Sequence, residues 1–156
     1  MERVLFTPEG YKKLKEELEQ LEKVERFEII KAIEVARAHG DLSENAEYHA
    51  AKERQGHIEA RIQYLNSKLG AAEVIDTRGQ EFEKVVFGVK VRLENVETEE
   101  ESVYMLVGPD ESDIKEGKIS IMSPLGKALI GKEEGDEVEF RSPSGPKTYE
   151  IIEIFS

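Results

Sequence analysis

Apolar residues recur at heptad spacing in the first half of the chain, with polar residues between them. Two runs step by three and four residues in alternation, and they comprise Tyr11, Leu14, Leu18 and Leu21, then Ile58, Ile62, Leu65, Leu69 and Ala72. Heptad spacing places apolar side chains in one seam along a helix. The first seam slips after Leu21, where Glu25 and Glu28 occupy apolar positions, and resumes with Ile29, Ile30, Ile33 and Ala36.

Two such seams joined by a short polar break predict an antiparallel helical hairpin. Pairing the arms around residue 42 brings Leu14 near Leu69 and Leu21 near Ile62, so the seams face each other. An arm of roughly 30 residues would be about 45 Å long.

The second half changes to period-two alternation with β-branched residues, which is typical of strands. Strands are expected over residues 85–93, 103–107, 119–121, 138–140 and 149–154. Between the third and fourth, Ser123 can cap, Pro124 can begin and Gly131 can end a short helix. Within it, Leu125, Leu129 and Ile130 are spaced to be buried. The chain is therefore expected to be α+β, with an antiparallel coiled-coil hairpin over 1–76, a linker over 77–83 and a small α+β domain over 84–156.

Charge and composition narrow the classes of function. The 22 Lys and Arg against 34 Asp and Glu give a net charge of −12, so strong binding to free DNA or RNA is not expected. The absence of cysteine excludes disulfides, thiolate zinc sites and cysteine nucleophiles. No apolar run has the length of a membrane span, and the first residues do not resemble a signal peptide. A cytoplasmic protein without membrane contact is expected.

The acidic tract GDLSENAEYHAAKE, residues 40–53, separates the two arms and allows two interpretations. In the first, Gly40 ends one helix and Asp41 caps the next, with Glu44 completing a capping box. In the second, Asp41 and Glu44 supply oxygen ligands to Mg²⁺. Two carboxylates are too few to hold the ion tightly, but they can complete a site that another molecule half-builds.

Other residues near this tract are weaker candidates for a metal-binding, catalytic or phosphate-binding role. The three histidines lack metal-binding spacing and are expected on solvated helix faces. Ser43 has no adjacent base that would make it a nucleophile. Arg37, Lys52 and Arg54 could contact a phosphate backbone, or they could be solvated or paired with nearby Glu residues.

Residues 33–53, IEVARAHGDLSENAEYHAAKE, closely resemble the tip of the bacterial transcript cleavage factors, the Gre factor family. The likeness extends through residues 7–10, 74–76, 86–88 and 119–131, and so covers essentially the whole chain. One departure is Phe27, where many members have Pro. That difference bears on the bend of the first helix and not on the tip.

The resemblance implies a fold and a function. Gre factors have an N-terminal antiparallel coiled coil and a C-terminal domain similar to the FKBP fold. They are transcription elongation factors that bind RNA polymerase through its secondary channel. There they stimulate the polymerase's intrinsic cleavage of the RNA 3′ end in backtracked or arrested complexes. The chain would then be no enzyme itself but an accessory factor to the active site of RNA polymerase.

The resemblance also implies roles for individual residues. Asp41 and Glu44 would be the tip carboxylates that hold a Mg²⁺ ion shared with the polymerase and orient the attacking water, with Ser43 between them. The ion would be bound only in the complex, and the free protein would need no cofactor. Arg37 and Lys52 would lie near the extruded nascent RNA. Ser123 and Pro124 are the polymerase-docking candidates, and the other interpretation of their segment is an ordinary core helix.

Three rival functions remain open on the sequence. Some Gre-like proteins bind the same channel and inhibit or modulate polymerase without stimulating cleavage, although the intact acidic tract argues against that. An FKBP-like domain could be a prolyl isomerase, but a fold does not confer an activity. A chaperone-like coiled-coil adaptor would be indifferent to substitution of Asp41 and Glu44.

Overall fold

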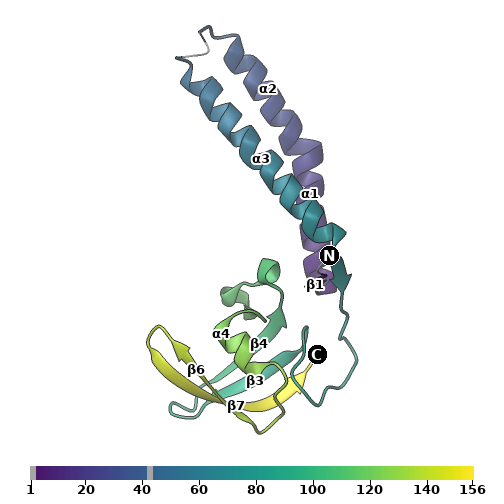
Figure 1. Cartoon of the computed structure of the whole chain (residues 1–156), viewed down its shortest axis with the longest axis vertical. Helices are drawn as coiled ribbons and strands as arrows, with labels where there is room; N and C mark the ends of the chain where they lie inside the picture. The colour runs from purple at the N-terminus through teal and green to yellow at the C-terminus, as the bar shows by residue number, and fades with distance from the viewer. Residues whose placement is uncertain (1–2, 42–43) are drawn as a thin grey trace. The chain divides into compact units, whose positions relative to one another are not determined.

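The computed structural model describes residues 3–41 and 44–156 and contains two compact units (Figure 1). One unit comprises Tyr11–Ala72, and the other comprises Arg3–Gly10 together with Glu73–Ser156. The first described residues therefore group with residues that lie far along the chain. The predicted α+β class and the helical hairpin are confirmed.

The helical unit is an antiparallel hairpin. Its first arm runs through α1 (Pro8–Gln20), a π-helical segment η1 (Leu21–Glu25) and α2 (Arg26–Arg37), and its second arm is α3 (Ala46–Gly70). Figure 1 shows α2 and α3 side by side. Three ion pairs join the arms, and they are Glu17–Arg61 at 2.7 Å, Glu25–Arg54 at 3.7 Å and Arg26–Glu59 at 2.8 Å. The pair Glu17–Arg61 lies nearer the outer ends of both arms than the other two pairs, as expected of an antiparallel hairpin.

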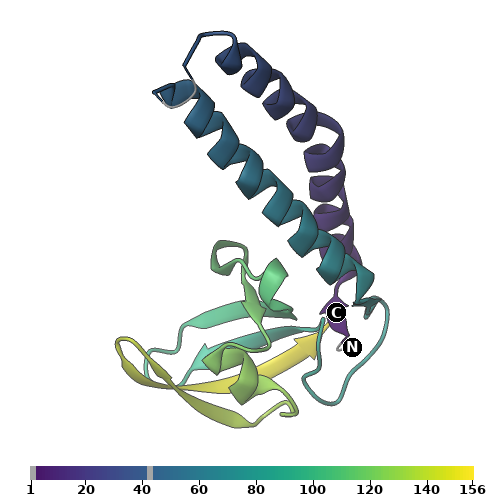
Figure 2. The same ribbon diagram turned by 45° about the horizontal axis from the view of Figure 1, so that its top comes forward.

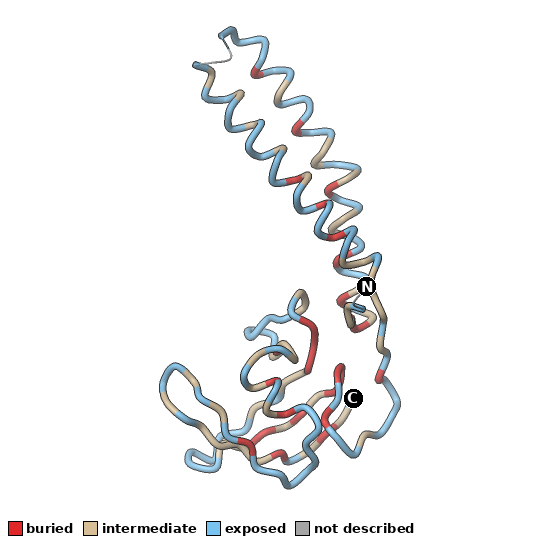
Figure 3. Tube along the Cα trace, viewed as in Figure 1, coloured by how far each residue is buried: buried red, intermediate tan, exposed pale blue. Residues whose placement is uncertain are grey.

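The π-helical segment explains the slip in the first seam. The buried side chains Leu14, Leu21, Ile29 and Ala36 follow one another at intervals of seven, eight and seven residues. The additional residue is absorbed where the Arg26 N–H donates to the Leu21 carbonyl, five residues back. The seam then faces α3 again, where Ile58, Ile62 and Leu65 are buried (Figure 3).

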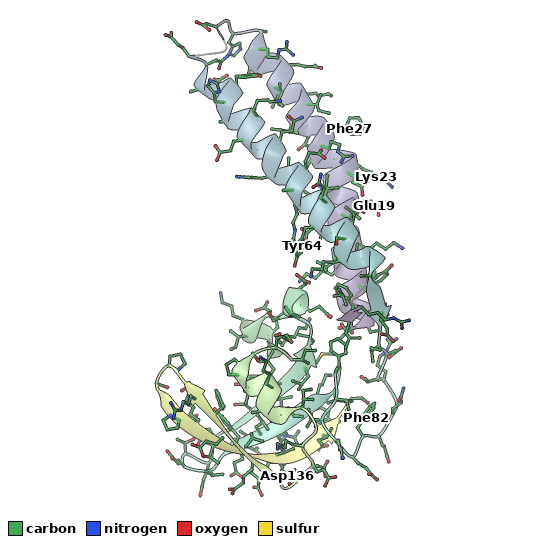
Figure 4. The ribbon with its side chains drawn as sticks, viewed as in Figure 1. Glu19, Lys23, Phe27, Tyr64, Phe82 and Asp136 are labelled. Carbon is green, nitrogen blue, oxygen red and sulfur yellow. The ribbon has the colours of Figure 1, made fainter. Side chains whose placement is uncertain are left out.

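Ile30 and Phe27 of the first arm lie outside this seam. Ile30, expected in it, is 40% exposed, so this part of the prediction was wrong. Phe27 is 63% exposed and projects from α2 on the side away from α3 (Figure 4).

The start of α1 is capped by Thr7. The Thr7 hydroxyl accepts the Gly10 N–H at 3.1 Å, and Pro8 is the first helical residue. Glu111, in the short helix η2 (Pro109–Glu111), accepts the Thr7 N–H at 2.9 Å and also the Thr7 hydroxyl. A Cβ at Gly10 would lie 1.8 Å from the Glu111 carboxylate, so the absence of a side chain there permits this contact. Just before it, β1 (Val4–Phe6) pairs with β2 (Ala72–Val74).

A five-stranded sheet forms the body of the second unit. Its order is β5-β4-β3-β7-β6, with every neighbouring pair antiparallel except the parallel pair β4–β5. The strands are β3 (Lys90–Asn95), β4 (Glu101–Val107), β5 (Lys118–Ser120), β6 (Glu137–Ser142) and β7 (Gly145–Phe155). The short helices η3 (Ile114–Glu116) and α4 (Pro124–Leu129) flank β5, and α4 covers one face of the sheet (Figure 2). Val91, Leu93, Leu106, Leu129 and Ile151 are fully buried between them.

Two details of this unit correct the sequence prediction. The strand expected over 85–93 begins only at Lys90, because Gly88 has a φ of +89° and its N–H donates to the Leu106 carbonyl at 2.7 Å. Ile130, expected to be buried, is 39% exposed because α4 ends at Leu129. Within the described parts of the chain, no helix is long and apolar enough to span a membrane.

Candidate functional site

The acidic tract forms the connection between α2 and α3. The last helical residue of α2 is Arg37, and its C-cap is Ala38. Gly40 has a φ of +119°, a conformation that side chains rarely adopt. The first arm ends three residues before Gly40, which was the predicted stop.

Asn45 provides the cap of α3, and the predicted cap at Asp41 was wrong. The Asn45 Oδ1 accepts the Tyr48 N–H at 3.0 Å, and its Nδ2 donates to the Ala36 carbonyl at 2.6 Å. An amide side chain can accept and donate at once, which a carboxylate cannot. The helix consequently begins at Ala46, and Glu44 completes no capping box with Asp41.

The two candidate carboxylates lie just before this cap. Asp41 and Glu44 are both exposed, and Glu44 makes no hydrogen bond or ion pair with any other described residue. Carboxylate oxygens are the ligands Mg²⁺ prefers, and one or two from a protein are usual. In the described ranges 3–41 and 44–156, no group of three or more His, Asp or Glu could hold a metal alone. The donor set therefore fits a partial Mg²⁺ site, and Ser43, expected between the two acids, lies outside the described residues.

Other charged side chains surround the connection. Glu47, in the first turn of α3, pairs with His39 at 3.2 Å between Oε2 and Nδ1. Arg54 forms an ion pair with Glu25, which confirms the paired alternative for that residue. Lys52 donates to Gln55 at 3.2 Å and is exposed, and Arg37 is exposed with no partner among the described residues. Arg37 and Lys52 thus leave their cationic groups near the acidic tract without an ion pair to a described carboxylate.

The second predicted site is the start of α4. The Ser123 hydroxyl caps this helix by accepting the Gly126 N–H at 3.1 Å, and it donates to the Ser120 carbonyl at 2.6 Å. A Cβ at Gly126 would lie 2.0 Å from that carbonyl, so α4 is held very close to the end of β5. Pro124 follows in the first turn and is exposed.

Ser123 and Pro124 line a pocket of about 500 Å³ within this unit. Its wall includes three aromatic side chains, Tyr104, Phe140 and Tyr149, the last two stacked at 5.7 Å between ring centroids. Three cations also line it, and they are Lys118, Arg141 and Lys147. Sequence reasoning missed these cations, because they come from three separate strands and no local pattern links them.

The chain thus combines a helical hairpin that carries an acidic connection with a small α+β unit that contains an apolar, cation-lined pocket. Residues 4–74 match the family model "Transcription elongation factor, N-terminal", and residues 80–156 match "Transcription elongation factor, GreA/GreB, C-term". The chain belongs to the GreA/GreB family of transcription elongation factors, as its sequence motifs predicted.

Similar proteins extend over almost the full length. Transcription elongation factor GreA of Thermodesulfovibrio yellowstonii is 61% identical over 153 residues, which cover 98% of this chain and 97% of that protein. GreA of Desulfotalea psychrophila is 55% identical over 154 residues, covering 99% and 96%. The crystal structure of GreA factor homolog 1 (Gfh1) of Thermus thermophilus is 29% identical with a TM-score of 0.44, covering 99% of both chains.

Proposed function

We propose that this chain binds bacterial RNA polymerase in the cytoplasm and reaches its active centre through the secondary channel. There it stimulates the polymerase's intrinsic cleavage of the RNA 3′ end in backtracked or arrested complexes. Family membership supports the elongation role. The acidic net charge of −12 supports a protein partner rather than free nucleic acid.

The exposure of Asp41 and Glu44 is the observation that carries the proposal. A helix N-terminus would normally account for two nearby acids. Here Asn45 makes that cap, while both carboxylates remain accessible to solvent. Exposed acids that do not form the N-cap of α3 are suited to a ligand that another molecule brings.

Within the complex, Asp41 and Glu44 complete the coordination of a Mg²⁺ ion that the polymerase half-binds. In two-metal phosphoryl transfer, an ion held there would supply charge stabilisation to the attacking or the leaving oxygen. The chain's own contribution is to present two oxygen donors and to orient the water through a carboxylate. Two donors bind Mg²⁺ weakly by themselves, so the free protein carries no cofactor.

Arg37 and Lys52 have a supporting electrostatic role. Both are exposed and neither is neutralised by a described acid. A cation close to the extruded RNA 3′ segment attracts its phosphates and offsets the repulsion from the neighbouring acids. These two residues therefore hold the RNA strand near the carboxylate pair.

The pocket beside Ser123 and Pro124 docks the factor on the polymerase. Its aromatic wall accepts a bulky apolar side chain, and its volume of about 500 Å³ is of the usual size for such sites. Arg141 and Lys147 have no ion-pair partner among the described residues, although acids outnumber cations in this unit. They favour a partner segment whose apolar anchor is flanked by acidic residues.

The cleavage function is tested with stalled, backtracked elongation complexes in Mg²⁺. Asp41→Asn and Glu44→Gln should each lose most of the stimulation while still competing with the wild-type protein for polymerase. Glu53→Gln is the matched control, since it removes an exposed charge from the same tract. If the tip variants and the control all stimulate cleavage like the wild type, the proposed role of the carboxylates is wrong.

Docking is tested separately by measuring binding to polymerase. Arg141→Glu and Lys147→Glu together should weaken binding by roughly tenfold, and more so at low salt, because rim charges mainly steer association. Lys132→Glu is the control, as an exposed lysine of the same unit that does not line this pocket. Equal effects of the pocket and control variants would refute the assignment of this surface.

The alternative of a Gre-like binder that inhibits or modulates polymerase is not favoured. Relatives that share 53–61% identity over nearly the full chain carry the name transcription elongation factor GreA, whereas the identity to Gfh1 is 29%. The same cleavage assay separates the two functions, because an inhibitor would slow the intrinsic reaction.

A further inference from the structure

One side chain, Asn45, joins the two arms of the hairpin next to the acidic pair. Its Oδ1 accepts the Tyr48 N–H at 3.0 Å, and its Nδ2 donates to the Ala36 carbonyl at 2.6 Å. Ala36 is buried in the last turns of α2, whereas Tyr48 is in the first turn of α3. The amide therefore connects the end of one helix to the start of the other.

Capping alone would not require an amide at this position. In the same chain Ser123 caps α4 by accepting the N–H three residues on, the same relation that Asn45 has to Tyr48. A serine hydroxyl is too short to reach a carbonyl that the longer Asn45 Nδ2 approaches at 2.6 Å. Aspartate could cap as well, but its carboxylate cannot donate. Asn is the short side chain that supplies both bonds at once.

The two bonds fix both ends of the connection that carries the acids. Glu44 directly precedes Asn45, and Asp41 lies between Asn45 and the Ala36 carbonyl along the chain. A free loop would sample many orientations, and a shared metal site requires oxygen donors held in a narrow range of positions. Closing the loop at its base restricts that sampling without touching the ligands.

We infer that Asn45 is a positioning residue for the proposed cleavage reaction, holding Asp41 and Glu44 in register for the ion shared with polymerase. This inference rests on the proposed function. Asn45 touches neither the RNA nor the metal in this role. Its amide bridge to Ala36 sets the fraction of bound factor whose carboxylates are correctly placed.

The test separates the bridge from the cap. Asn45→Ser keeps the acceptor for Tyr48 and removes the bridge, while Asn45→Ala removes both. Asn66→Ser is the matched control, at an exposed position on the same helix where the side chain makes no hydrogen bond to a described residue. Amide hydrogen exchange at Tyr48 reports the cap independently of activity, and it should remain slow in Asn45→Ser and become faster in Asn45→Ala.

The functional readout is the cleavage rate at saturating factor, set against the concentration that gives half of that rate. A typical net hydrogen bond corresponds to about a fivefold change in population, so Asn45→Ser should lower the saturating rate about fivefold. The half-saturating concentration should stay unchanged, since docking is not affected. A residue with only a structural role would lower the amount of competent factor and leave the saturating rate intact.

A double-substitution experiment completes the test. In a Glu44→Gln, Asp41→Asn background, Asn45→Ser should have no further effect, because nothing remains to be positioned. An Asn45→Ser variant with the wild-type saturating rate would overturn the inference, as would an equal loss in Asn66→Ser. If instead Asp41→Asn and Glu44→Gln keep the wild-type rate, the proposed function itself has failed, which is a different result.

Discussion

Replacing Gly10 by alanine should destabilise the unit formed by Arg3–Gly10 and Glu73–Ser156, although alanine is the better helix former. An alanine Cβ would lie 1.8 Å from the Glu111 Oε1 and 2.0 Å from its Cδ. Because these atoms are the end of a flexible side chain, the carboxylate would swing away rather than the backbone. Thr7, which is 4% exposed, would then lose the partner of its N–H and of its hydroxyl.

The magnitude follows from the bonds that are lost and the propensity that is gained. Two hydrogen bonds to a carboxylate contribute roughly 1.5–3 kcal/mol each, and partial exposure of Glu111 favours the lower end. The gain from replacing glycine in a helix offsets up to about 1 kcal/mol. A net loss of about 2 kcal/mol in the free energy of unfolding is expected.

Urea denaturation followed by circular dichroism measures this loss, and the Glu111→Ala background supplies the control. With no carboxylate to displace, Gly10→Ala should become neutral or stabilising by up to about 1 kcal/mol. The sign of its effect would thus change between the two backgrounds. An equal destabilisation in both would refute the contact with Glu111 as the reason for glycine at this position.

Three further predictions concern the helical unit. Deleting Lys23 from the π-helical segment should leave the unit folded, because the deletion restores seven-residue spacing to the seam. Deleting Lys31 from α2 should instead abolish cooperative thermal unfolding, because that deletion misaligns the seam. Leu65→Ala should cost about 2–5 kcal/mol in urea denaturation, since this side chain is fully buried, and a cost below about 1 kcal/mol would contradict its place in the seam. The hydrogen bond from Arg61 lowers the pKa of Glu17 in the folded protein. The Glu17 carboxylate therefore takes up a proton more readily in the unfolded chain. The stability that this pair adds is lost as pH falls below the ordinary pKa of 4.5. Arg61→Gln should therefore weaken the acid dependence of the unfolding free energy, measured by denaturation at several pH values, and an unchanged dependence would exclude the pair as its source.

Helix capping was predicted correctly from sequence at α4 and incorrectly at α3. Ser123 caps the helix expected of it, because its hydroxyl and the N–H that it accepts are three residues apart. The acidic tract offered more than one acceptor before α3, and Asn45 prevailed over Asp41 through a bond to Ala36. That carbonyl lies nine residues away, and a local pattern does not include it.

The slip of the first seam was likewise predicted only in part from the sequence. The heptad pattern located the irregularity after Leu21, but it did not say how the helix would absorb one extra residue. A π turn does so by moving one hydrogen bond to the fifth preceding residue. At the pocket proposed for docking, the family resemblance named Ser123 and Pro124, whereas Arg141 and Lys147 join them only through strand pairing.

The most direct test of the account is the Mg²⁺ dependence of transcript cleavage at saturating factor. In the proposed mechanism, Glu44 is an oxygen donor to an ion shared with RNA polymerase. Glu44→Gln should therefore raise the Mg²⁺ concentration for half-maximal cleavage by roughly tenfold or more, with partial recovery of the rate at high Mg²⁺. Glu53→Gln should leave the curve unchanged. A Glu44→Gln variant with the wild-type Mg²⁺ dependence would contradict the claim that the tip carboxylates complete a metal site.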